Sequence, residues 1–312
     1  MTSANKTASL IDKLPSVRGN LKINAPIAKF TWFRVGGPAD ILFEPADQND
    51  LRNFLLQLSP EIPVTVLGAG SNTIIRDSGV EGVIIKLGRN FSNIKIQDST
   101  VSAGAGAMNI LIARAAKTSG VANLEFFNGI PGTLGGALQM NAGAYDFEIK
   151  DILLDVDALD RFGNLHHAKA IDLQYNYREC NAPEDWIFVS ARLKGETDNP
   201  KKIAARMLKA AIEREKTQPV RERTGGSTFK NPPNHKAWKL IEISGCRGLR
   251  RGGAQISGSH CNFLINRGSA TAEDLEDLGE EVRTRVEKET GILLEWELVR
   301  IGRKLLKGHH YE

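Results

Sequence analysis

The chain has few cysteines, no long apolar run and no cysteine pattern of the metal-binding kind. Its 312 residues include only Cys180, Cys246 and Cys261, and no two of them form a CxxC pair. Cysteines this few and this widely spaced argue against a disulfide framework and a structural zinc site. No apolar run approaches the ~18–20 residues that span a bilayer, and the N-terminus lacks a signal-peptide stretch. We therefore expect a cytoplasmic protein that binds neither a metal nor a membrane.

The charge balance is only mildly basic. Lysine and arginine exceed aspartate and glutamate by a net +4, while hydrophobic residues make up 41% and charged residues 25% of the chain. This excess fits either an anionic small ligand or a solvated basic face, and it does not require nucleic acid. RNA binding favours exposed aromatic side chains among the basic ones, and Phe229 and Trp238 are the nearby candidates. We therefore expect no nucleic-acid partner.

Periodicity in the first 200 residues predicts short helices and strands. Residues 1–24 are polar and are expected to form a flexible N-terminus, with structure beginning near Thr31. Asp47 is placed to cap a helix with Leu51, Phe54, Leu55 and Leu58 on its apolar face. Residues 63–67 form an apolar run that predicts a buried strand. Further strands are expected at 83–87 and 101–103, and a helix follows with Met108, Leu111, Ile112, Ala115 and Ala116 inward and Gly120 after its end.

The last third of the chain shows a change of pattern near residues 195–200. A helix is expected there, with Ile203, Met207, Leu208, Ala211 and Ile212 on one face. A strand at 262–266 precedes a helix that Thr271 and Asp274 should open as a capping box. The chain should close with a strand over 292–302. With 312 residues, the chain is long enough for two or three modest cores.

Two glycine-rich segments are candidates for binding phosphate or a flat ligand. The strand at 63–67 runs into Gly68-Ala69-Gly70-Ser71-Asn72, where bare backbone can approach a diphosphate. Taken alone, this segment is more simply explained as an ordinary tight turn. Residues 129–136, Gly-Ile-Pro-Gly-Thr-Leu-Gly-Gly, combine four glycines with a proline that fixes one φ angle. A ligand lying against the backbone, or a tight crossover, explains that composition.

A Rossmann dinucleotide site does not fit these glycines. The GxGxxG pattern needs a small third residue, whereas the spacing from Gly68 and Gly70 reaches Thr73. The spacing from Gly104 and Gly106 reaches Asn109. A dinucleotide bound to this chain is therefore expected to lie outside a Rossmann turn.

Five motifs in a fixed order make the chain similar to a known family. They are GAGSN, GIPGTLGGALQMNAGAY, Tyr177-Arg178, Gly226-Ser227-Thr228-Phe229-Lys230-Asn231-Pro232 and LLEWELVRIG, and they extend over most of the chain. Together they closely resemble the UDP-N-acetylenolpyruvoylglucosamine reductase (MurB) family. The resemblance implies an FAD-containing oxidoreductase that uses NADPH to reduce UDP-N-acetylglucosamine-enolpyruvate to UDP-N-acetylmuramate, a step in peptidoglycan synthesis for the cell wall.

The resemblance also implies the fold and the cofactor site. The fold class is α+β, with a two-subdomain FAD-binding domain of the vanillyl-alcohol oxidase type over residues 25–200, divided at about 88. An α+β substrate domain covers 201–312. No His or Cys lies in either glycine segment, so noncovalent FAD is expected. The residues implied to contact it are Gly68, Ala69, Gly70, Ser71, Asn72, Gly129, Ile130, Pro131, Gly132, Thr133, Gly135, Gly136, Asn141, Ala142, Gly143 and Ala144.

Three residues match the catalytic positions of the family. Reduction of an enol ether requires stabilisation of the charge that develops on its conjugated carboxylate, and then a proton at carbon. Arg178 matches the family arginine that polarises this carboxylate, Ser227 the proton donor, and Glu297 the glutamate of the closing strand. Leu293, Val299 and Ile301 share a face with Glu297, which predicts a partly apolar setting. Glu295, on the same face, is the alternative to Glu297.

The resemblance extends to the substrate side, with one departure. Tyr177, Lys230, Asn231 and His260 are implied to contact the UDP-sugar. The family usually has Ser two residues after the arginine, whereas this chain has Cys180. No tyrosine lies between Arg178 and Ser227, so the chain resembles the shorter type without a tyrosine-bearing substrate loop. We expect a monomer. Another FAD-dependent oxidoreductase of this fold and a nonenzymatic binder of sugar nucleotides or RNA are the alternative functions.

Overall fold

The computed structural model describes residues 14–304, and this part of the chain divides into two compact units. Unit 1 takes the chain up to Lys22 together with Phe43–Ala69 and Ile84–Gln218, and unit 2 takes Ile23–Leu42, Gly70–Val83 and the chain from Pro219 onward. Each unit is therefore built from segments that are far apart in the sequence. The boundary expected near residue 200 does not describe this interleaving, and the functional domain division stays a prediction.

The N-terminal region is more ordered than the sequence indicated. Strand β1 begins at Asn20, inside the segment expected to be flexible, while residues 1–13 lie outside the described part. The isolated 3-10 turn η1 (Ala28–Phe30) follows it. A four-stranded sheet has the order β1-β2-β5-β3. Its strands are β1 (Asn20–Pro26), β2 (Pro38–Glu44), β5 (Val80–Ile85) and β3 (Val64–Val66).

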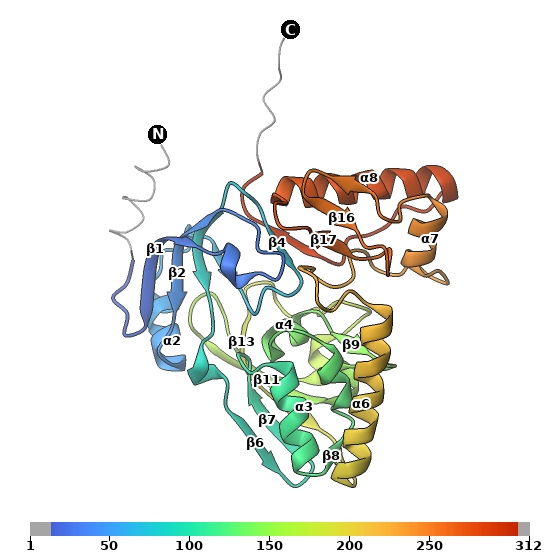
Figure 1. Ribbon diagram of the computed structural model, residues 1–312. Helices are drawn as coiled ribbons and strands as arrows, with labels where there is room; N and C mark the ends of the chain where they lie inside the picture. The colour runs from blue at the N-terminus through green and yellow to red at the C-terminus, as the bar shows by residue number, and fades with distance from the viewer. Residues whose placement is uncertain (1–13, 305–312) are drawn as a thin grey trace, which may run out of the picture. The chain divides into compact units, whose positions relative to one another are not determined.

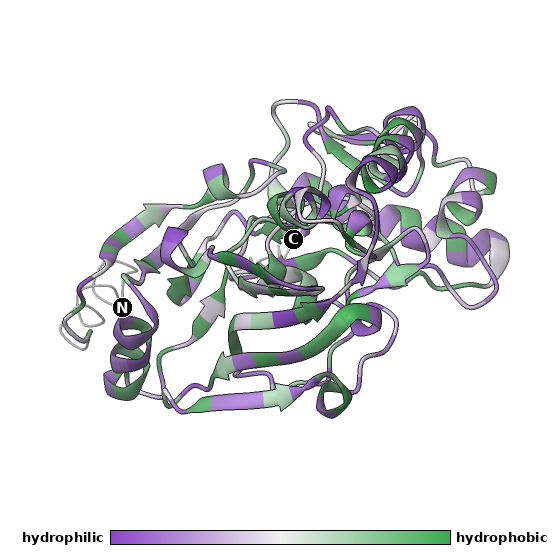
Figure 2. Cartoon of the chain, turned by 90° about the horizontal axis from the view of Figure 1, so that it is seen from below, coloured by the Kyte–Doolittle hydropathy of each residue, from purple (hydrophilic) through white to green (hydrophobic). Residues whose placement is uncertain are grey.

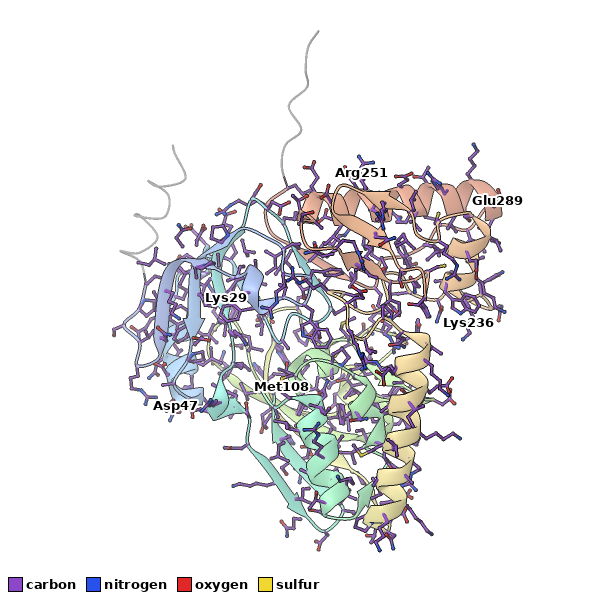
Figure 3. The ribbon with its side chains drawn as sticks, in the orientation of Figure 1. Lys29, Asp47, Met108, Lys236, Arg251 and Glu289 are labelled. Atoms are coloured by element: carbon purple, nitrogen blue, oxygen red, sulfur yellow. The ribbon has the colours of Figure 1, made fainter. Side chains whose placement is uncertain are left out.

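Helix α2 (Gln48–Gln57) confirms the predicted cap. The side chain of Asp47, labelled at the start of the helix in Figure 3, accepts a hydrogen bond from the amide of Asp50. The apolar face is buried as expected. Strand β3 is also confirmed, but it is half-buried rather than buried because Val66 faces outward.

The largest sheet of unit 1 has five antiparallel strands. Buried Val189, Ala191 and Leu193 alternate with more exposed residues along β13, as a half-buried strand requires. In the register, Leu193 lies opposite Val101 and Val156 lies opposite Ala191. The strand order is β12 (Leu165–Lys169), β11 (Leu153–Leu159), β13 (Ile187–Lys194), β7 (Thr100–Gly104) and β6 (Ile94–Gln97). Strands β11, β13, β7 and β6 are labelled in the lower part of Figure 1.

Two helices, α3 (Asn109–Thr118) and α6 (Pro200–Thr217), pack on the short turn η3 (Glu125–Gly129) of unit 1. They bury a narrower stripe than the periodicity predicted, since Leu111 of α3 is exposed. In α6, Ile203 and Met207 are buried, whereas Leu208, Ala211 and Ile212 are exposed. The rest of unit 1 covers only one side of α6, and the periodicity of apolar residues does not reveal how wide the buried face of a helix is.

Several short elements complete unit 1. The segment after η3 forms helix α4 (Leu134–Gln139), the two-stranded hairpin β9 (Gly143–Ala144) and β10 (Phe147–Glu148), and the single helical turn α5 (Ile149–Ile152). Strand β8 (Val121–Ala122) pairs with β14 (Glu196–Thr197). The remaining 3-10 turns are η2 (Arg89–Phe91) and η4 (Ala170–Leu173).

Unit 2 places helix α8 (Ala272–Thr290) on a three-stranded antiparallel sheet (Figure 1). The capping box of Thr271 and Asp274 is confirmed, and Gly291 ends the helix at φ +72°. The sheet has the order β15 (Arg250–Arg251), β16 (Ala254–Ile256) and β17 (Leu264–Asn266), and helix α7 (Ala237–Ile243) packs on α8.

The closing strand is shorter than predicted. Only β18 (Val299–Ile301) is a regular strand, and it pairs in parallel with β4 (Thr73–Ile75). The preceding residues make one isolated bridge, between Trp296 and Phe229. The core of unit 2 runs from Phe33 through Phe229 to Leu298. Hydrophobic and hydrophilic residues intermingle along the helices and strands (Figure 2), and no helix among residues 14–304 is long and apolar enough to span a membrane.

Candidate functional site

The first glycine segment of unit 1 approaches the second one closely. A Cβ on Gly68 would lie 2.8 Å from Oγ1 of Thr133, the residue that precedes α4. Gly68 lies two residues after the end of β3, and its lack of a Cβ lets the backbone there approach the side chain of Thr133 at the start of α4. A diphosphate cradle needs such an approach, because backbone amides reach a ligand only where Cβ atoms do not block the way.

The start of α3 fixes the second glycine segment. Met108, labelled beside α3 in Figure 3, pairs with Thr133 in an isolated bridge. The amide of Asn109 donates to the carbonyl of Gly132 at 3.0 Å, and its side-chain Nδ2 donates to the carbonyl of Ile130 at 3.3 Å. Gly132 has φ +119°, a conformation that L side chains rarely adopt. The segment is therefore held in one conformation.

Two further features indicate that this region fits a ligand. A Cβ on Gly136 would meet only Thr133 Oγ1, at 3.8 Å, so the glycine opens a space rather than filling a packed contact. The buried Oδ1 of Asn109 has no hydrogen-bond partner within residues 14–304. A buried unpaired acceptor is costly unless a ligand or water pairs with it. Glycine-lined space beside an unpaired polar atom fits the flat, polar FAD molecule implied by the sequence.

The rest of the first glycine motif lies in unit 2, where it contacts the closing segment. The carbonyl of Asn72 accepts the amide of Val299 at 2.9 Å, and its side-chain Nδ2 donates to the carbonyl of Glu297 at 3.0 Å. Gly70 has φ +60°, and its carbonyl accepts the amide of Trp32 at 3.0 Å. Asn72, expected only to touch the cofactor, therefore also holds the backbone of Glu297.

Arg178 of unit 1 occupies a strained two-residue turn. Asn176 and Glu179 exchange backbone hydrogen bonds across it, at 3.1 and 3.2 Å, and Arg178 has φ +58°. Positive φ is uncommon for a long side chain and is concentrated at functional sites. The guanidinium donates to the carbonyl of Gly143 at 3.1 Å and lies 5.0 Å from the ring of half-exposed Tyr177. The structure thus places Arg178 directly on the end of the second glycine motif.

Ser227 and Glu297 of unit 2 meet through Thr228. Ser227 is half-buried and pairs with Phe263 in an isolated bridge, while buried Thr228 accepts the amide of Glu297 on its carbonyl at 2.9 Å. The hydroxyl of Thr228 accepts the amide of Leu264 at 3.0 Å. Sequence reasoning did not single out Thr228, although its position directly after Ser227 was a signal. This residue sets the register between the serine and the glutamate.

The predicted face of Glu297 was wrong in detail. Leu293 and Val299 are exposed, whereas Leu294 and Leu298 are buried, because the segment is not a continuous strand and does not alternate strictly. The choice between the two glutamates is nevertheless informed by the structure. Glu295 is 77% exposed and its carboxylate lies 3.7 Å from Nζ of Lys230, whereas Glu297 is half-buried. The half-buried carboxylate is better placed to act electrostatically.

The other substrate-side candidates of unit 2 have mixed surroundings. The amide of Lys230 donates to the carbonyl of Glu295 at 2.8 Å. Oδ1 of Asn231 accepts the amide of Ala237 at 3.0 Å, so it caps α7 just after Lys236, which Figure 3 labels. His260 packs edge-on against Phe263, and its burial lowers the pKa of the imidazole. A neutral imidazole can donate and accept hydrogen bonds but brings no positive charge.

Cys180, at the position where the sequence resemblance implied serine, is a buried free thiol. Burial raises the pKa of this thiol, so it stays protonated at neutral pH. Its neighbour is the buried hydroxyl of Tyr175, which makes no hydrogen bond of standard geometry among the described residues. Cys246 and Cys261 are also buried and free, and residues 14–304 contain no cluster of His, Cys, Asp and Glu able to hold a metal.

Comparisons with known proteins agree with this geometry. Residues 39–169 match the family described as FAD binding domain, and residues 218–301 match UDP-N-acetylenolpyruvoylglucosamine reductase, C-terminal domain. The chain is 54% identical over 308 residues to a UDP-N-acetylenolpyruvoylglucosamine reductase from Parvibaculum lavamentivorans, which covers 99% of each chain. Another, from Paramagnetospirillum magneticum, is 54% identical over 300 residues, covering 96% of this chain and 98% of the relative.

A solved structure of similar fold supports the same relationship. The crystal structure of UDP-N-acetylenolpyruvylglucosamine reductase from Thermus caldophilus superimposes with a TM-score of 0.79 at 33% identity, covering 92% of this chain and 100% of that one. This likeness and the FAD-binding match confirm the predicted fold class.

Proposed function

Because the chain belongs to the UDP-N-acetylenolpyruvoylglucosamine reductase family, we propose that it reduces UDP-N-acetylglucosamine-enolpyruvate to UDP-N-acetylmuramate with NADPH and bound FAD. This is an oxidoreductase reaction of peptidoglycan synthesis, which serves cell-wall growth and division. The observation that carries the proposal is the link through Thr228, which brings a hydroxyl group and a half-buried carboxylate, Ser227 and Glu297, to neighbouring backbone positions.

The glycine-rich segments are proposed to hold FAD without a covalent bond. Gly68–Asn72 would contact the diphosphate and residues 129–144 the flat rings. The close approach of Gly68 to Thr133 and the open space beside Gly136 support this assignment. When bound and reduced by NADPH, FAD would supply the hydride that the enol ether needs. The protein's part is to hold the cofactor and to exclude water from the reacting groups.

Arg178 is proposed to bind the substrate carboxylate. A guanidinium presents a planar fork that matches a carboxylate, and its charge stabilises the negative charge that develops as hydride reaches the β-carbon. Its turn and its contact with Gly143 hold the guanidinium before substrate arrives, which supports this role. A preorganised group is worth more than a mobile one, because its ordering cost is met during folding.

Ser227 is proposed to donate the proton to the α-carbon, and Glu297 to support the charge changes beside it. A serine hydroxyl is a weak acid, so it needs a polar setting that favours the transfer. The preceding Gly226 has φ +82° and open space at its Cβ position, which leaves room for a substrate beside Ser227. The backbone of Glu297 is fixed by Thr228 and Asn72, so the carboxylate starts from a defined position.

The remaining assignments concern the residues that bind the substrate, the cellular location and the oligomeric state. Tyr177, Lys230, Asn231 and His260 are proposed to contact the UDP-sugar, His260 as a neutral hydrogen-bonding group. Asn231 would contribute while capping α7. The enzyme is proposed to be a cytoplasmic monomer that needs neither nucleic acid nor a membrane, and to belong to the shorter type without a tyrosine-bearing substrate loop.

One assay tests the proposal directly. NADPH oxidation by the purified yellow protein should be fast with UDP-N-acetylglucosamine-enolpyruvate and slow without it, and acid should release all of the flavin. Turnover of NADPH with another acceptor only would favour a different FAD-dependent oxidoreductase. A colourless protein that takes up no FAD would favour a nonenzymatic binder.

A further inference from the structure

The guanidinium of Arg178 is held by a set of contacts that the motifs alone did not indicate. Besides its bond to the Gly143 carbonyl, Nη1 lies 3.4 Å from the carbonyl of Asn141 and 3.6 Å from Oε1 of Glu148. The side chain of Arg178 is mostly buried. A long, flexible side chain loses considerable conformational entropy on being fixed, so these contacts determine where the charge lies.

The side chain of Asn141 connects the turn that carries Arg178 to Glu148 and Lys150. Asn141 is fully buried, has φ +41°, and its Nδ2 donates to the carbonyl of Asn176 and to Oε2 of Glu148, each at 2.9 Å. Its Oδ1 accepts the amide of Lys150 at 3.1 Å. A side-chain amide has two N–H donors, and both are therefore used within the protein. The resemblance implied contact with FAD, but the side chain is directed to the turn that carries Arg178.

Glu148 is in turn fixed by its own neighbours. Its carboxylate accepts the amide of Asp151 in a capping box, and Oε2 lies 2.9 Å from Nζ of Lys150. Oε1 is the atom nearest Arg178, at a distance longer than a hydrogen bond. The carboxylate therefore attracts the guanidinium without forming a bidentate pair with it. Such an arrangement directs the cation by charge attraction rather than by a two-bond carboxylate pair.

We propose that Asn141 and Glu148 are positioning residues for Arg178, an inference that rests on the proposed function. They act through the arginine and do not touch the reacting atoms. Loss of the Glu148 carboxylate should slow reduction of the enolpyruvyl group and leave NADPH's reduction of FAD unchanged, and loss of the Asn141 side chain should slow the same enolpyruvyl half-reaction. A displacement of about 1 Å in a catalytic group can cost ~10²-fold in rate, so we expect a loss between ~10- and 10²-fold.

A double-mutant cycle separates positioning from general structural damage. The variants are Glu148→Gln, Arg178→Ala and the two together, each loaded with FAD, and the measurement is reoxidation of the reduced flavin by the enolpyruvyl substrate. Glutamine keeps an acceptor for Asn141 and removes the charge. Glu148→Gln should slow flavin reoxidation in the wild-type background and should cause no further slowing in the Arg178→Ala background. Equal slowing in both backgrounds, or none in the wild type, would overturn the proposal.

Two further variants sharpen the comparison. Asp151→Asn removes one negative charge from the same short helix and keeps the acceptor for the Glu148 amide, so it should reoxidise at the wild-type rate. Asn141→Gly deletes the amide while glycine retains the left-handed backbone without strain. In the wild-type background, Asn141→Gly should slow flavin reoxidation as Glu148→Gln does. Combined with Arg178→Ala, it should cause no further slowing. A slow Asp151→Asn would mean that any charge change here disturbs the reaction, and positioning would be rejected.

A crystal structure gives a result that does not depend on activity. In Glu148→Gln and Asn141→Gly, the contact between Arg178 Nη2 and the Gly143 carbonyl should be lost or the guanidinium should occupy more than one position. An unmoved guanidinium in both variants would refute the positioning role even if rates fell. If the wild-type protein failed to reduce the enolpyruvyl substrate, the proposed function would fail, while these crystal structures would still decide whether the two residues hold Arg178.

Discussion

The carbonyl oxygen of Thr228 accepts the amide N–H of Glu297 at 2.9 Å, and this bond helps to set the spacing of two proposed catalytic residues. Ser227 directly precedes Thr228, so its backbone position relative to Glu297 is fixed by the same contact. The isolated bridge between Phe229 and Trp296 continues the pairing on the other side. Ser227 and Glu297, about 70 residues apart in the sequence, therefore belong to one local structure, and a disturbance of one should be felt by the other.

The first prediction concerns Arg178 and Glu297. Arg178→Ala and Glu297→Gln should each slow reoxidation of the flavin by the enolpyruvyl substrate by ~10²–10³, the usual cost of one preorganised electrostatic group. Reduction of the flavin by NADPH should hardly change, because neither side chain is needed for it. Stopped-flow absorbance of the flavin measures both halves. Glu295→Gln is the control, since that side chain is 77% exposed; if it proved more damaging than Glu297→Gln, the assignment within the pair would be wrong.

The second prediction uses the open space beside Gly136. Gly136→Ala should leave the protein without FAD as stable as before or more stable, because alanine favours a helix over glycine by ~1 kcal/mol and the new methyl group meets only Thr133 Oγ1. If FAD lies against this backbone, the methyl group should weaken FAD binding markedly. Titration of the flavin-free protein with FAD, followed by flavin fluorescence, measures the affinity.

A matched control for that test exists outside both glycine motifs. A Cβ on Gly88 would also meet no atom within 4 Å, and its φ of −91° suits alanine. Gly88→Ala should therefore change neither stability nor FAD affinity. Unchanged FAD affinity in Gly136→Ala would remove the residue from the proposed cofactor site.

Features with local signals were predicted well from the sequence. Helix α8 has a capping box, an apolar stripe and a terminal glycine within 21 residues of each other, and all three are observed. The cap of α2 by Asp47 is of the same kind. These signals depend on hydrogen bonds between residues three or four positions apart, so a single sequence contains them. The catalytic trio came instead from the order of motifs, which carries information about a family.

Features that depend on distant segments were not predictable in this way. Nothing local in Gly70–Val83 shows that it belongs with the C-terminal unit, because its partner β18 lies more than 200 residues later. The same holds for the closing segment, where alternation placed Leu293 inside although it is exposed. The contacts of Asn141 with Arg178 and Glu148 also depend on the folded turn, since glycine-rich composition pointed only to a ligand.

The third prediction follows from the environment of His260. Burial, with a smaller contribution from the charge of Arg247, lowers the pKa of the imidazole below its usual value near 6.5. As the pH falls through that value, the unfolded chain binds a proton that the folded protein does not, so stability decreases. The thermal midpoint should therefore fall less in His260→Gln than in the wild type between about pH 7.5 and pH 5.5. Exposed His235, changed to Gln, is the control; parallel pH profiles for wild type and His260→Gln would contradict the assignment.

The fourth prediction is that Ser227→Ala divides the reaction into its two halves. Only the step that follows hydride transfer needs a proton at carbon, and alanine deletes a single oxygen from a half-buried residue whose bridge to Phe263 uses the backbone. Folding, FAD binding and bleaching of the flavin by NADPH should therefore stay near normal. Return of the yellow colour on addition of the enolpyruvyl substrate should slow by the ~10²–10⁴ typical of general acid catalysis. Ser227→Cys should recover part of this rate, because a thiol is a stronger acid than a hydroxyl. Near-normal reoxidation in Ser227→Ala would show that water or another group delivers the proton, and the structural link through Thr228 would then serve only to hold Glu297.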